Sequence, residues 1–384
     1  MSVASVMPEL LIISRSGRAL AASAKRAGYT CDVIDAFADA DTSRYARHVW
    51  SVDSFDSETL TPLLEDWSCR RRQDQSMPAA IIVPGSGMEA TPALVDFLQA
   101  YGTVAANPAN LVHRLKDPET FFPLLDRLAI DHPPTSDDPS TTVAGEWLLK
   151  PIGAEGGAGI RVWSAGQALP ARHYLQQRSD GLPVSVVFLA DTRLVRPIGF
   201  NRCLTMGQLN GNAADYRYAG AIRWQAPDAL ARATEYALHE LVRATGLRGL
   251  LGMDMLWNAD AMQVLELNPR PPASFELHEN DEPGSGSLIA AHLSACAGVL
   301  SERLLADALR QDQCTGKLVV YADEPVQIPA SYDWPAWIVD RPIVGSRLEA
   351  DSPICTIISG AGTTEACLAS LQTLRQDFLK DINN

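Results

Sequence analysis

Residues 249–269 read GLLGMDMLWNADAMQVLELNP, and this stretch decides the architecture that we predict for the chain. It contains two β-type runs separated by a polar turn at residues 258–261, which is the pattern of a β-hairpin. With the turn centred on Asp260, Asp254 in the first strand lies directly across from Glu266 in the second. Two carboxylates that face each other in adjacent strands destabilise the pair by about half a kcal/mol or more.

A divalent cation would remove this repulsion. Side chains alternate between the faces of a strand, so Asn268 points the same way as Glu266. Leu265 and Leu267 then point the other way, into a core. Carboxylate and amide oxygens suit magnesium, or manganese, with water and substrate phosphates completing the shell. The alternative is a hairpin with an acidic face in water, which its strongly apolar neighbours disfavour, so we predict Asp254, Glu266 and Asn268 as metal ligands.

A second signal lies upstream, where residues 148–159 read LLKPIGAEGGAG. The chain has only five lysines, so Lys150, placed between an apolar strand and a glycine cluster, indicates a specific role. Backbone without Cβ atoms can approach phosphate oxygens closely. The flanking β-type runs predict a hairpin and not the strand–loop–helix of a Walker P-loop. Together with Lys116 upstream and the metal hairpin downstream, the pattern describes a nucleoside triphosphate held between two lobes. The glycines concerned are Gly153, Gly156, Gly157 and Gly159.

The composition is that of a globular protein, with 46% hydrophobic and 20% charged residues among 384. A net charge of −14 argues against nucleic acid or an anionic membrane as partner, because both require a basic face. The seven cysteines are scattered and never form a CxxC pair, so we expect reduced thiols and neither disulfides nor a zinc site. No apolar run is long enough to cross a bilayer and no signal peptide is evident, so we expect a cytoplasmic protein.

The order of β-type and helical patterns predicts a mixed α/β and α+β chain. The first hundred residues alternate strand and helix, which predicts a parallel sheet. Residues 184–191 and 193–204 follow as antiparallel strands, and residues 228–247 as the longest amphipathic helix, closed by Gly246. Beyond residue 300 we expect a helix and then strands that pack back on the body.

These residues resemble the ATP-grasp superfamily of carboxylate-amine ligases, over most of the chain. The resemblance rests on a lysine before a helix, the LLKPIGAEGGAGI lysine and glycine loop, the YLQQRSDGLPVSVVF hinge, the GLLGMDM strand and LELNPRP. It implies a Rossmann-like N-terminal domain, two α+β lobes that hold ATP between them, and a C-terminal extension rich in β-structure. The expected boundaries are 1–106 for the N-terminal α/β domain, 107–178 for the small lobe, 179–300 for the large lobe with the metal site, and 301–384 for the extension.

The resemblance also assigns roles. Lys116 and Lys150 would contact the ATP phosphates, and Arg270 would stabilise an acyl phosphate. The glycine loop would close over the transferred group through Gly156, Gly157 and Gly159, and Gln176 and Gln177 would lie at the adenine hinge. Where many relatives carry a ribose-binding glutamate, this chain has Pro183, so other groups must bind the ribose.

A narrower resemblance concerns the segments GSGMEATPALVDFL, KDPETFF and WIVDRPIVGSRLEADSPICTIIS. They are similar to a bacterial branch found with tetrahydromethanopterin and a methanofuran-like cofactor, whose functional counterpart is archaeal tyramine-glutamate ligase. This resemblance implies that glutamate is joined to tyrosine or tyramine for one-carbon metabolism, by an enzyme with small-molecule substrates that could form a homodimer. The alternatives are a dipeptide or polyglutamate-type ligase, and a nucleotide-binding regulatory protein without turnover.

Several further residues permit two interpretations. Glu89, just past a strand, lies where open α/β sheets bind ligands, or simply in a tight turn. Lys116 could be a surface residue, because RLKDPET inverts the usual aspartate–lysine order, although we favour ATP contact. His278 could line the acceptor site or pack beside Phe275. Three arginines could bind a second carboxylate of the substrate or could simply be solvated: Arg193, Arg196 and Arg202.

Overall fold

The computed structural model describes residues 7–73, 79–142, 145–164, 166–259, 261–280, 286–309 and 314–382. Its N-terminal part is a five-stranded parallel sheet in the order β3-β2-β1-β4-β5, which confirms the expected alternation of strands and helices. The strands are β1 Glu9–Ser14, β2 Cys31–Asp35, β3 Val49–Ser51, β4 Ala80–Pro84 and β5 Thr103–Val104. The helices between them are α1 Arg18–Arg26, α2 Ser57–Gln73 and α3 Leu94–Leu98.

Two helices connect this sheet to the next part of the chain. Helix α4 (Ala109–Lys116) ends at Lys116, and α5 (Pro118–Arg127) begins two residues later. The sharp division has a local cause, since the Asp117 side chain accepts a hydrogen bond from the Glu119 backbone N–H and a proline occupies the first helical position. Lys116 therefore lies directly before a helix, as predicted.

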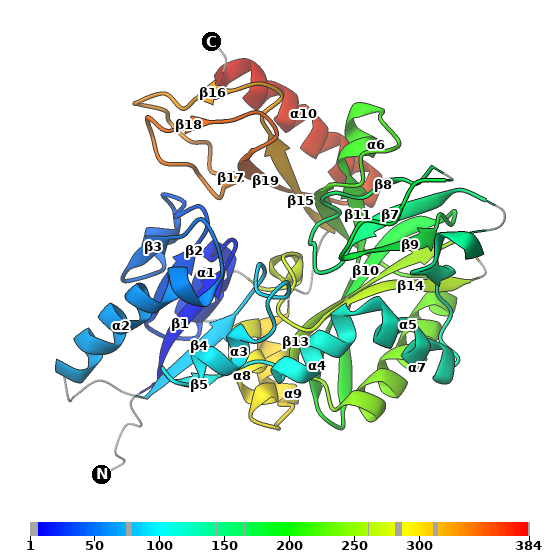
Figure 1. Ribbon diagram of the computed structural model, residues 1–384. Coiled ribbons are helices and arrows are strands. Elements are labelled where there is room, and N and C mark those ends of the chain that lie inside the picture. Colours follow the sequence, from blue (N-terminus) through cyan, green and yellow to red (C-terminus); the bar gives the residue numbers. More distant parts are fainter. Residues whose placement is uncertain are drawn as a thin grey trace.

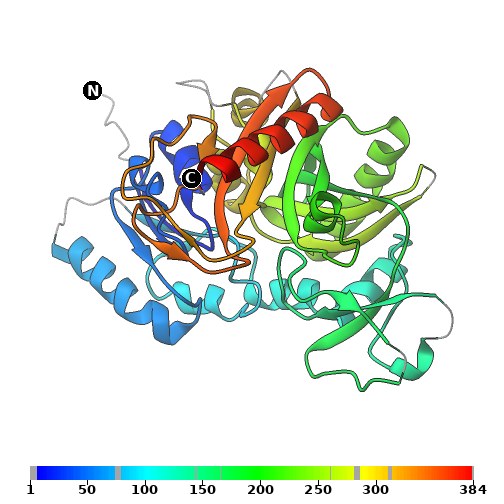
Figure 2. The same ribbon diagram turned by 90° about the horizontal axis from the view of Figure 1, so that it is seen from above.

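A small antiparallel sheet follows, in the order β6-β9-β7-β8. Strands β7 and β8 pair as a hairpin around the glycine loop, as the sequence predicts, although β8 is only two residues long. In Figure 2 this sheet projects from the side of the body, away from the N-terminal sheet. Its strands are β6 Thr135–Ser136, β7 Trp147–Pro151, β8 Arg161–Val162 and β9 His173–Gln177, with the 3-10 turn η2 (Pro139–Thr141) after β6.

The largest sheet has eight strands, in the order β14-β13-β10-β11-β12-β15-β19-β17. The antiparallel pairing of β10 with β11 and the β13–β14 hairpin were both predicted. Figure 1 shows this sheet at the centre of the molecule, with the parallel sheet on one side. Its first strands are β10 Leu182–Asp191, β11 Val195–Thr205, β12 Tyr218–Trp224, β13 Arg248–Trp257 and β14 Met262–Asn268, with the short helix α6 (Met206–Asn210) after β11.

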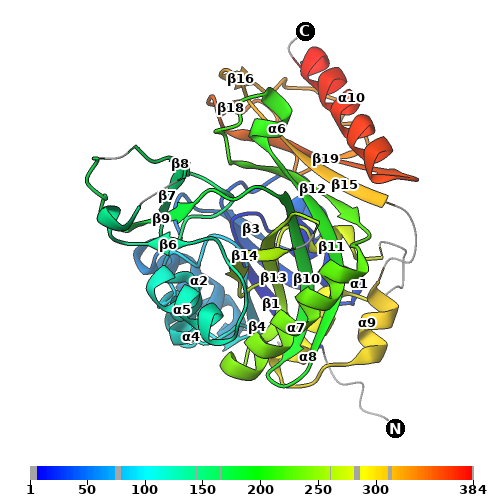
Figure 3. The ribbon, with the colours of Figure 1, turned by 90° about the vertical axis from the view of Figure 1, so that its right-hand side faces the viewer.

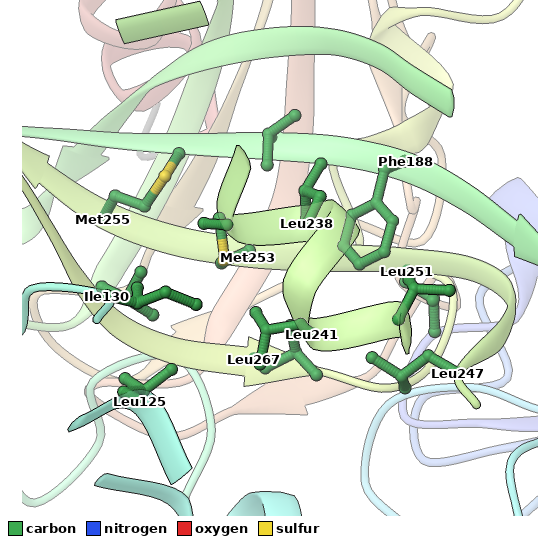
Figure 4. Packing of buried hydrophobic residues seen from close by; sticks show 14 of the residues in the cluster. Leu125, Ile130, Phe188, Leu238, Leu241, Leu247, Leu251, Met253, Met255 and Leu267 are labelled. Atoms are coloured by element: carbon green, nitrogen blue, oxygen red, sulfur yellow. The ribbon is translucent and has the colours of Figure 1, made fainter. Parts of the chain in front are cut away.

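Helices cover both faces of this sheet. Helix α7 (Asp228–Thr245) ends at Gly246, whose φ of 70° is the left-handed conformation expected of a C-terminal glycine. It packs with α5 against one face, where Leu125, Phe188 and Leu238 belong to one buried cluster (Figure 4). On the other face lie α8 (Leu288–Cys296) and α9 (Glu302–Ala308).

The C-terminal part extends the large sheet. Strands β15 (Cys314–Tyr321) and β19 (Pro353–Ala361) continue it beyond β12, with β17 (Ile338–Val339) at the edge. A separate two-stranded sheet pairs β16 (Val326–Gln327) with β18 (Arg347–Leu348). The predicted strands are therefore present.

Helix α10 (Thr364–Ile382), which covers β15 and β19 (Figure 3), was not predicted from the sequence. It buries Leu371 and Phe378 in a common cluster. All seven cysteines are free thiols, as predicted. Within the described residues, no helix has the length and apolar character needed to span a membrane.

Candidate active site

The predicted metal hairpin brings its two carboxylates face to face. Asp254 in β13 pairs directly with Glu266 in β14. The register shifts at the next residue, because Met255 pairs with Val264 and Leu265 has no partner. Leu265 is consequently only half-buried, so its predicted place in the core was wrong, whereas Leu267 is fully buried. The predicted turn centre, Asp260, lies outside the described residues.

Asn268 and Lys116 complete this cluster. The Asn268 side-chain N–H donates to Asp254 Oδ2 at 3.0 Å and to Glu266 Oε1 at 3.3 Å. Its Oδ1 accepts from Lys116 Nζ at 2.9 Å, and the same ammonium lies 3.5 Å from Glu266 and 3.3 Å from Glu89. Lys116 is thus a buried ion-pair partner of the predicted metal ligands, which excludes the surface interpretation.

The two facing carboxylates have opposite pKa shifts. Burial and the Glu266 charge raise the pKa of Asp254 well above its usual value. Burial acts in the same direction on Glu266, but the charges of Lys116 and Lys150 and the pairing with Asp254 together outweigh it and lower the pKa of that carboxyl. The pKa of Asp254 therefore stays raised although Lys116 and Arg270 lower it, and the hairpin needs a further cation to hold both carboxylates ionised.

This donor set fits magnesium. Two carboxylates and one amide oxygen are hard ligands on adjacent strands, and magnesium commonly takes one or two protein carboxylates together with substrate phosphates. Within the described ranges, no group of three or more His, Cys, Asp or Glu side chains forms a metal cluster, so a site here depends on Asn268 and on phosphate as additional ligands.

Lys150 and Gln176 share one face of the small sheet. Lys150 in β7 pairs with Tyr174, and Gln176 in β9 pairs with Leu148, so these side chains alternate onto the same face. Lys150 Nζ donates to Gln176 Oε1, while the buried Gln176 Nε2 has no hydrogen-bond partner. Gln177, one residue later, points to the opposite face, so Gln176 and Gln177 cannot both turn their side chains toward one ligand.

The Lys150 ammonium is almost completely desolvated. Burial lowers its pKa to about 8, although the charges of Glu266 and Asp254 act in the opposite direction. A buried ammonium with few anionic partners is well suited to hold phosphate oxygens.

The glycine loop packs against the segment that leads into β12. Gly156 accepts a hydrogen bond at its carbonyl oxygen from the Tyr218 N–H, at 2.8 Å. Gly157 has a φ of 71°, and a Cβ placed there would meet the Tyr216 carbonyl oxygen at 2.1 Å. Glycine is therefore required at residue 157, where the loop from β7 touches the start of β12.

Arg270, directly after the metal hairpin, is largely buried in an ionic cluster, with its side chain 14% exposed. Its Nε donates to Glu89 Oε2 at 3.0 Å, and its terminal nitrogen lies 3.7 Å from Glu155 Oε1. Glu89 is buried too, and burial raises the pKa of its carboxyl even though Arg270 and Lys116 lower it. Glu89 is thus part of the cluster, which was one of the two interpretations of its position after β4.

The remaining candidates lie elsewhere. His278 is buried, with Nε2 2.9 Å from Asn201 Oδ1, and burial and Arg223 lower its pKa to about 3, so it is neutral at physiological pH. Arg196 and Arg202 lie near Glu302 and Glu365, outside the cluster, and Arg193 is exposed. Pro183 lies in β10 opposite Leu256. The three arginines therefore contribute nothing to the ionic cluster.

Two residues of the cluster were missed. Glu155 is the one charged residue in an otherwise small or apolar loop, and this could have drawn attention to it. Arg15 lies after β1 and approaches Glu155 at 3.9 Å. Nothing in the sequence around Arg15 indicated this approach.

Comparison with known proteins matches part of the chain to a family model. A family model described as an ATP-grasp domain matches residues 115–274, which include the metal hairpin, the glycine loop and Arg270. A formate-dependent phosphoribosylglycinamide formyltransferase from Edwardsiella ictaluri (strain 93-146) is 26% identical over 281 residues, which cover 68% of each chain.

Solved structures resemble the whole chain. A Campylobacter jejuni biotin carboxylase has a TM-score of 0.72 at 15% identity, covering 95% of this chain and 90% of its own. A Bacillus licheniformis L-amino acid ligase has a TM-score of 0.69 at 12% identity, covering 96% and 97%. The N5-carboxyaminoimidazole ribonucleotide synthetase of Thermotoga maritima has a TM-score of 0.65 at 13% identity, covering 96% and 98%. The chain therefore has the ATP-grasp fold, and its residues 115–274 match the model of an ATP-grasp domain.

Proposed function

We propose that the protein is a carboxylate-amine ligase that forms an amide bond through an acyl phosphate. The observation that carries this proposal is the convergence of three cationic side chains, Lys116, Lys150 and Arg270, on the facing carboxylates Asp254 and Glu266. Buried cations beside a two-carboxylate site are suited to a polyphosphate with its metal ion.

The first step is phosphoryl transfer. A substrate carboxylate oxygen attacks the γ-phosphorus of ATP, the bond to the β,γ-bridging oxygen breaks, and ADP leaves. Lys150 and Lys116 hold the phosphate oxygens and offset the charge that develops on them. When bound by Asp254, Glu266 and Asn268, magnesium supplies further neutralisation of phosphate charge. The glycine loop excludes water, which would otherwise hydrolyse the acyl phosphate.

The second step is aminolysis. A neutral amine attacks the acyl carbon, the tetrahedral oxyanion collapses, and inorganic phosphate leaves with its bonding electrons while the nitrogen loses one proton. Arg270 is charged at all relevant pH values and stabilises the negative oxygen. The step requires no covalent nucleophile from the protein.

For substrates we propose glutamate as the acid and tyrosine or tyramine as the amine, in the biosynthesis of a methanofuran-like cofactor. The support is the similarity of the sequence segments described above. The Bacillus L-amino acid ligase, which matches over nearly the full length of both chains, supports a second candidate, the joining of two amino acids.

The test is ADP release. Purified protein with ATP and magnesium is incubated with glutamate and, separately, tyrosine, tyramine and other amino acids. We expect release that requires both glutamate and tyrosine or tyramine, with the amide identified by mass spectrometry. ADP release only with unrelated pairs of amino acids would favour the second candidate function. Absence of ADP release with every pair would contradict ligation.

The lowered pKa of Lys150 predicts proton uptake when a nucleotide binds. Its pKa of about 8 in the free protein leaves it partly deprotonated at pH 8.5, and adjacent phosphates would raise that pKa. Binding of a non-hydrolysable ATP analogue should therefore take up protons, most strongly between about pH 8 and 10. Calorimetric titrations in two buffers of different ionisation enthalpy measure this uptake.

The matched control for Lys150 is Lys150→Arg, because a guanidinium remains charged throughout this range. Proton uptake or release at other groups, including the metal ligands, is common to both proteins. It therefore cancels when the proton uptake of one protein is subtracted from that of the other. Equal uptake in both proteins would show that Lys150 does not contact the phosphates.

A further inference from the structure

The glycine loop carries its own carboxylate into the active site. Glu155 is the one charged residue between Ile152 and Ile160, and its side chain is only 14% exposed. Its Oε1 accepts a hydrogen bond from the Gly87 N–H at 2.7 Å. Gly87 lies in the turn after β4, in the N-terminal part of the chain, so this bond joins the small lobe to the parallel sheet.

Two guanidinium groups flank the same carboxylate. The Arg270 terminal nitrogen lies 3.7 Å from Glu155 Oε1, and Arg15 Nε lies 3.9 Å from Oε2. The Glu155 carboxyl also lies close enough to Glu89 to contribute to the raised pKa of that side chain. The Gly87 N–H, Arg15 and Arg270 come from three separate segments and converge on one anionic group, and we call these three groups the anion cradle.

The contacts of the glycine loop with the large lobe keep Glu155 in the anion cradle. The bond from Tyr218 to Gly156 and the close approach of Gly157 to Tyr216 hold the loop against the large lobe. The flanking glycines have positive φ values, so the segment can move away without steric cost from Cβ atoms. Glu155 is therefore a removable occupant, whereas the groups of the cradle belong to the body.

We propose that the anion cradle is the subsite for the carboxylate that the enzyme activates, and that Glu155 occupies it until this carboxylate displaces it. This inference rests on the proposed ligase function, because an activated carboxylate must lie beside both Arg270 and the phosphate-binding lysines. The ligand class is a carboxylate whose oxygens take the place of the Glu155 oxygens. Glu155 is a specificity-determining residue here, since it competes with the substrate.

The test compares carboxylate binding with and without the Glu155 side chain. We expect Glu155→Ala to bind L-glutamate about tenfold more tightly than the unmodified protein, measured by calorimetry in the presence of ADP and magnesium. Glu155→Gln keeps an oxygen for the Gly87 N–H but loses the charge, so it should fall between the two. Arg15→Ala should weaken binding about tenfold. Saturation-transfer NMR with acetate, a simple carboxylate probe, should rank the affinities of the variants in the same order.

Two exposed residues serve as controls. Glu302→Ala and Arg70→Ala remove surface ion pairs distant from the loop and should leave binding unchanged. Equal or weaker binding in Glu155→Ala, or unaltered binding in Arg15→Ala, would overturn the proposal.

Binding and turnover separate this inference from the proposed function. The expected order of affinities without any amide product would support the anion cradle and contradict ligation. If the enzyme forms the amide and Glu155→Ala leaves the KM for the acid unaltered, the result would support ligation and contradict the anion cradle.

Discussion

We expect Glu266→Gln to lose turnover while the fold remains intact. The substitution removes one of two facing carboxylates, and with it a predicted metal ligand and a partner of Lys116. Loss of several kcal/mol of transition-state charge stabilisation corresponds to a fall in kcat of about 10³-fold. Coupled measurement of ADP release checks this, and Mn²⁺ titration followed by electron paramagnetic resonance should show weaker metal binding.

The stability of the Glu266→Gln protein should move the other way. The pKa of Asp254 is raised because burial and the Glu266 charge disfavour its ionised form, so a neutral neighbour relieves that repulsion. We therefore expect a Tm that is unchanged or higher. The matched control is Glu235→Gln on the exposed surface of α7, which should retain full activity. Normal turnover in Glu266→Gln would show that the hairpin is not the metal site.

Arg18→Met destabilises the protein by about 3–5 kcal/mol, the usual cost of removing one partner from a buried ion cluster. Arg18 begins α1, and its guanidinium donates to Asp340 and to Glu276, each at 2.7 Å. The first partner belongs to the C-terminal part and the second to the 3-10 turn η3 (Phe275–Leu277), so one buried cation joins three parts of the chain. Methionine leaves Lys317 as the cation that remains beside Glu276.

Urea unfolding followed by tryptophan fluorescence measures this loss, with Arg70→Met as the control. Arg70 forms an exposed pair with Asp66 on α2, where we expect a change within about 0.5 kcal/mol. A loss below about 1 kcal/mol in Arg18→Met would contradict the prediction.

The effect of Arg18→Met also depends on pH. Burial raises the pKa of Asp340, but Arg18 and Lys317 outweigh this and leave it lowered, and the same holds for Glu276. Carboxyls with lowered pKa stabilise the folded state above their unfolded pKa and lose that contribution as the pH falls. The difference between the unmodified protein and Arg18→Met should therefore narrow toward acidic pH.

Much of the site could be predicted because its signals are local. Alternation along two strands placed Glu266 and Asn268 on one face, and a symmetric turn placed Asp254 opposite Glu266, as the register confirms. The register shift after Asp254 could not be predicted, because an unpaired residue in a hairpin changes pairing without changing composition. This shift is why Leu265 left the core.

Contacts between distant segments were beyond prediction. Glu89 and Arg270 are 181 residues apart in sequence, and Gly87 and Glu155 are 68 apart, yet each pair is hydrogen-bonded. Helix α10 was missed for a related reason, since its buried side chains acquire partners only when β15 and β19 extend the large sheet.

The sequence by itself determined the strand order of the hairpins, the glycine loop, the helix boundary at Lys116 and the residue types that a nucleotide and its metal require. Each depends on neighbours a few positions away, through alternation, capping or backbone freedom. Only the tertiary structure decided which charges are buried together, that Lys116 pairs with Glu266, and that Glu155 enters the anion cradle. Burial and ion pairing depend on the meeting of separate segments, and no local pattern encodes the distance between them.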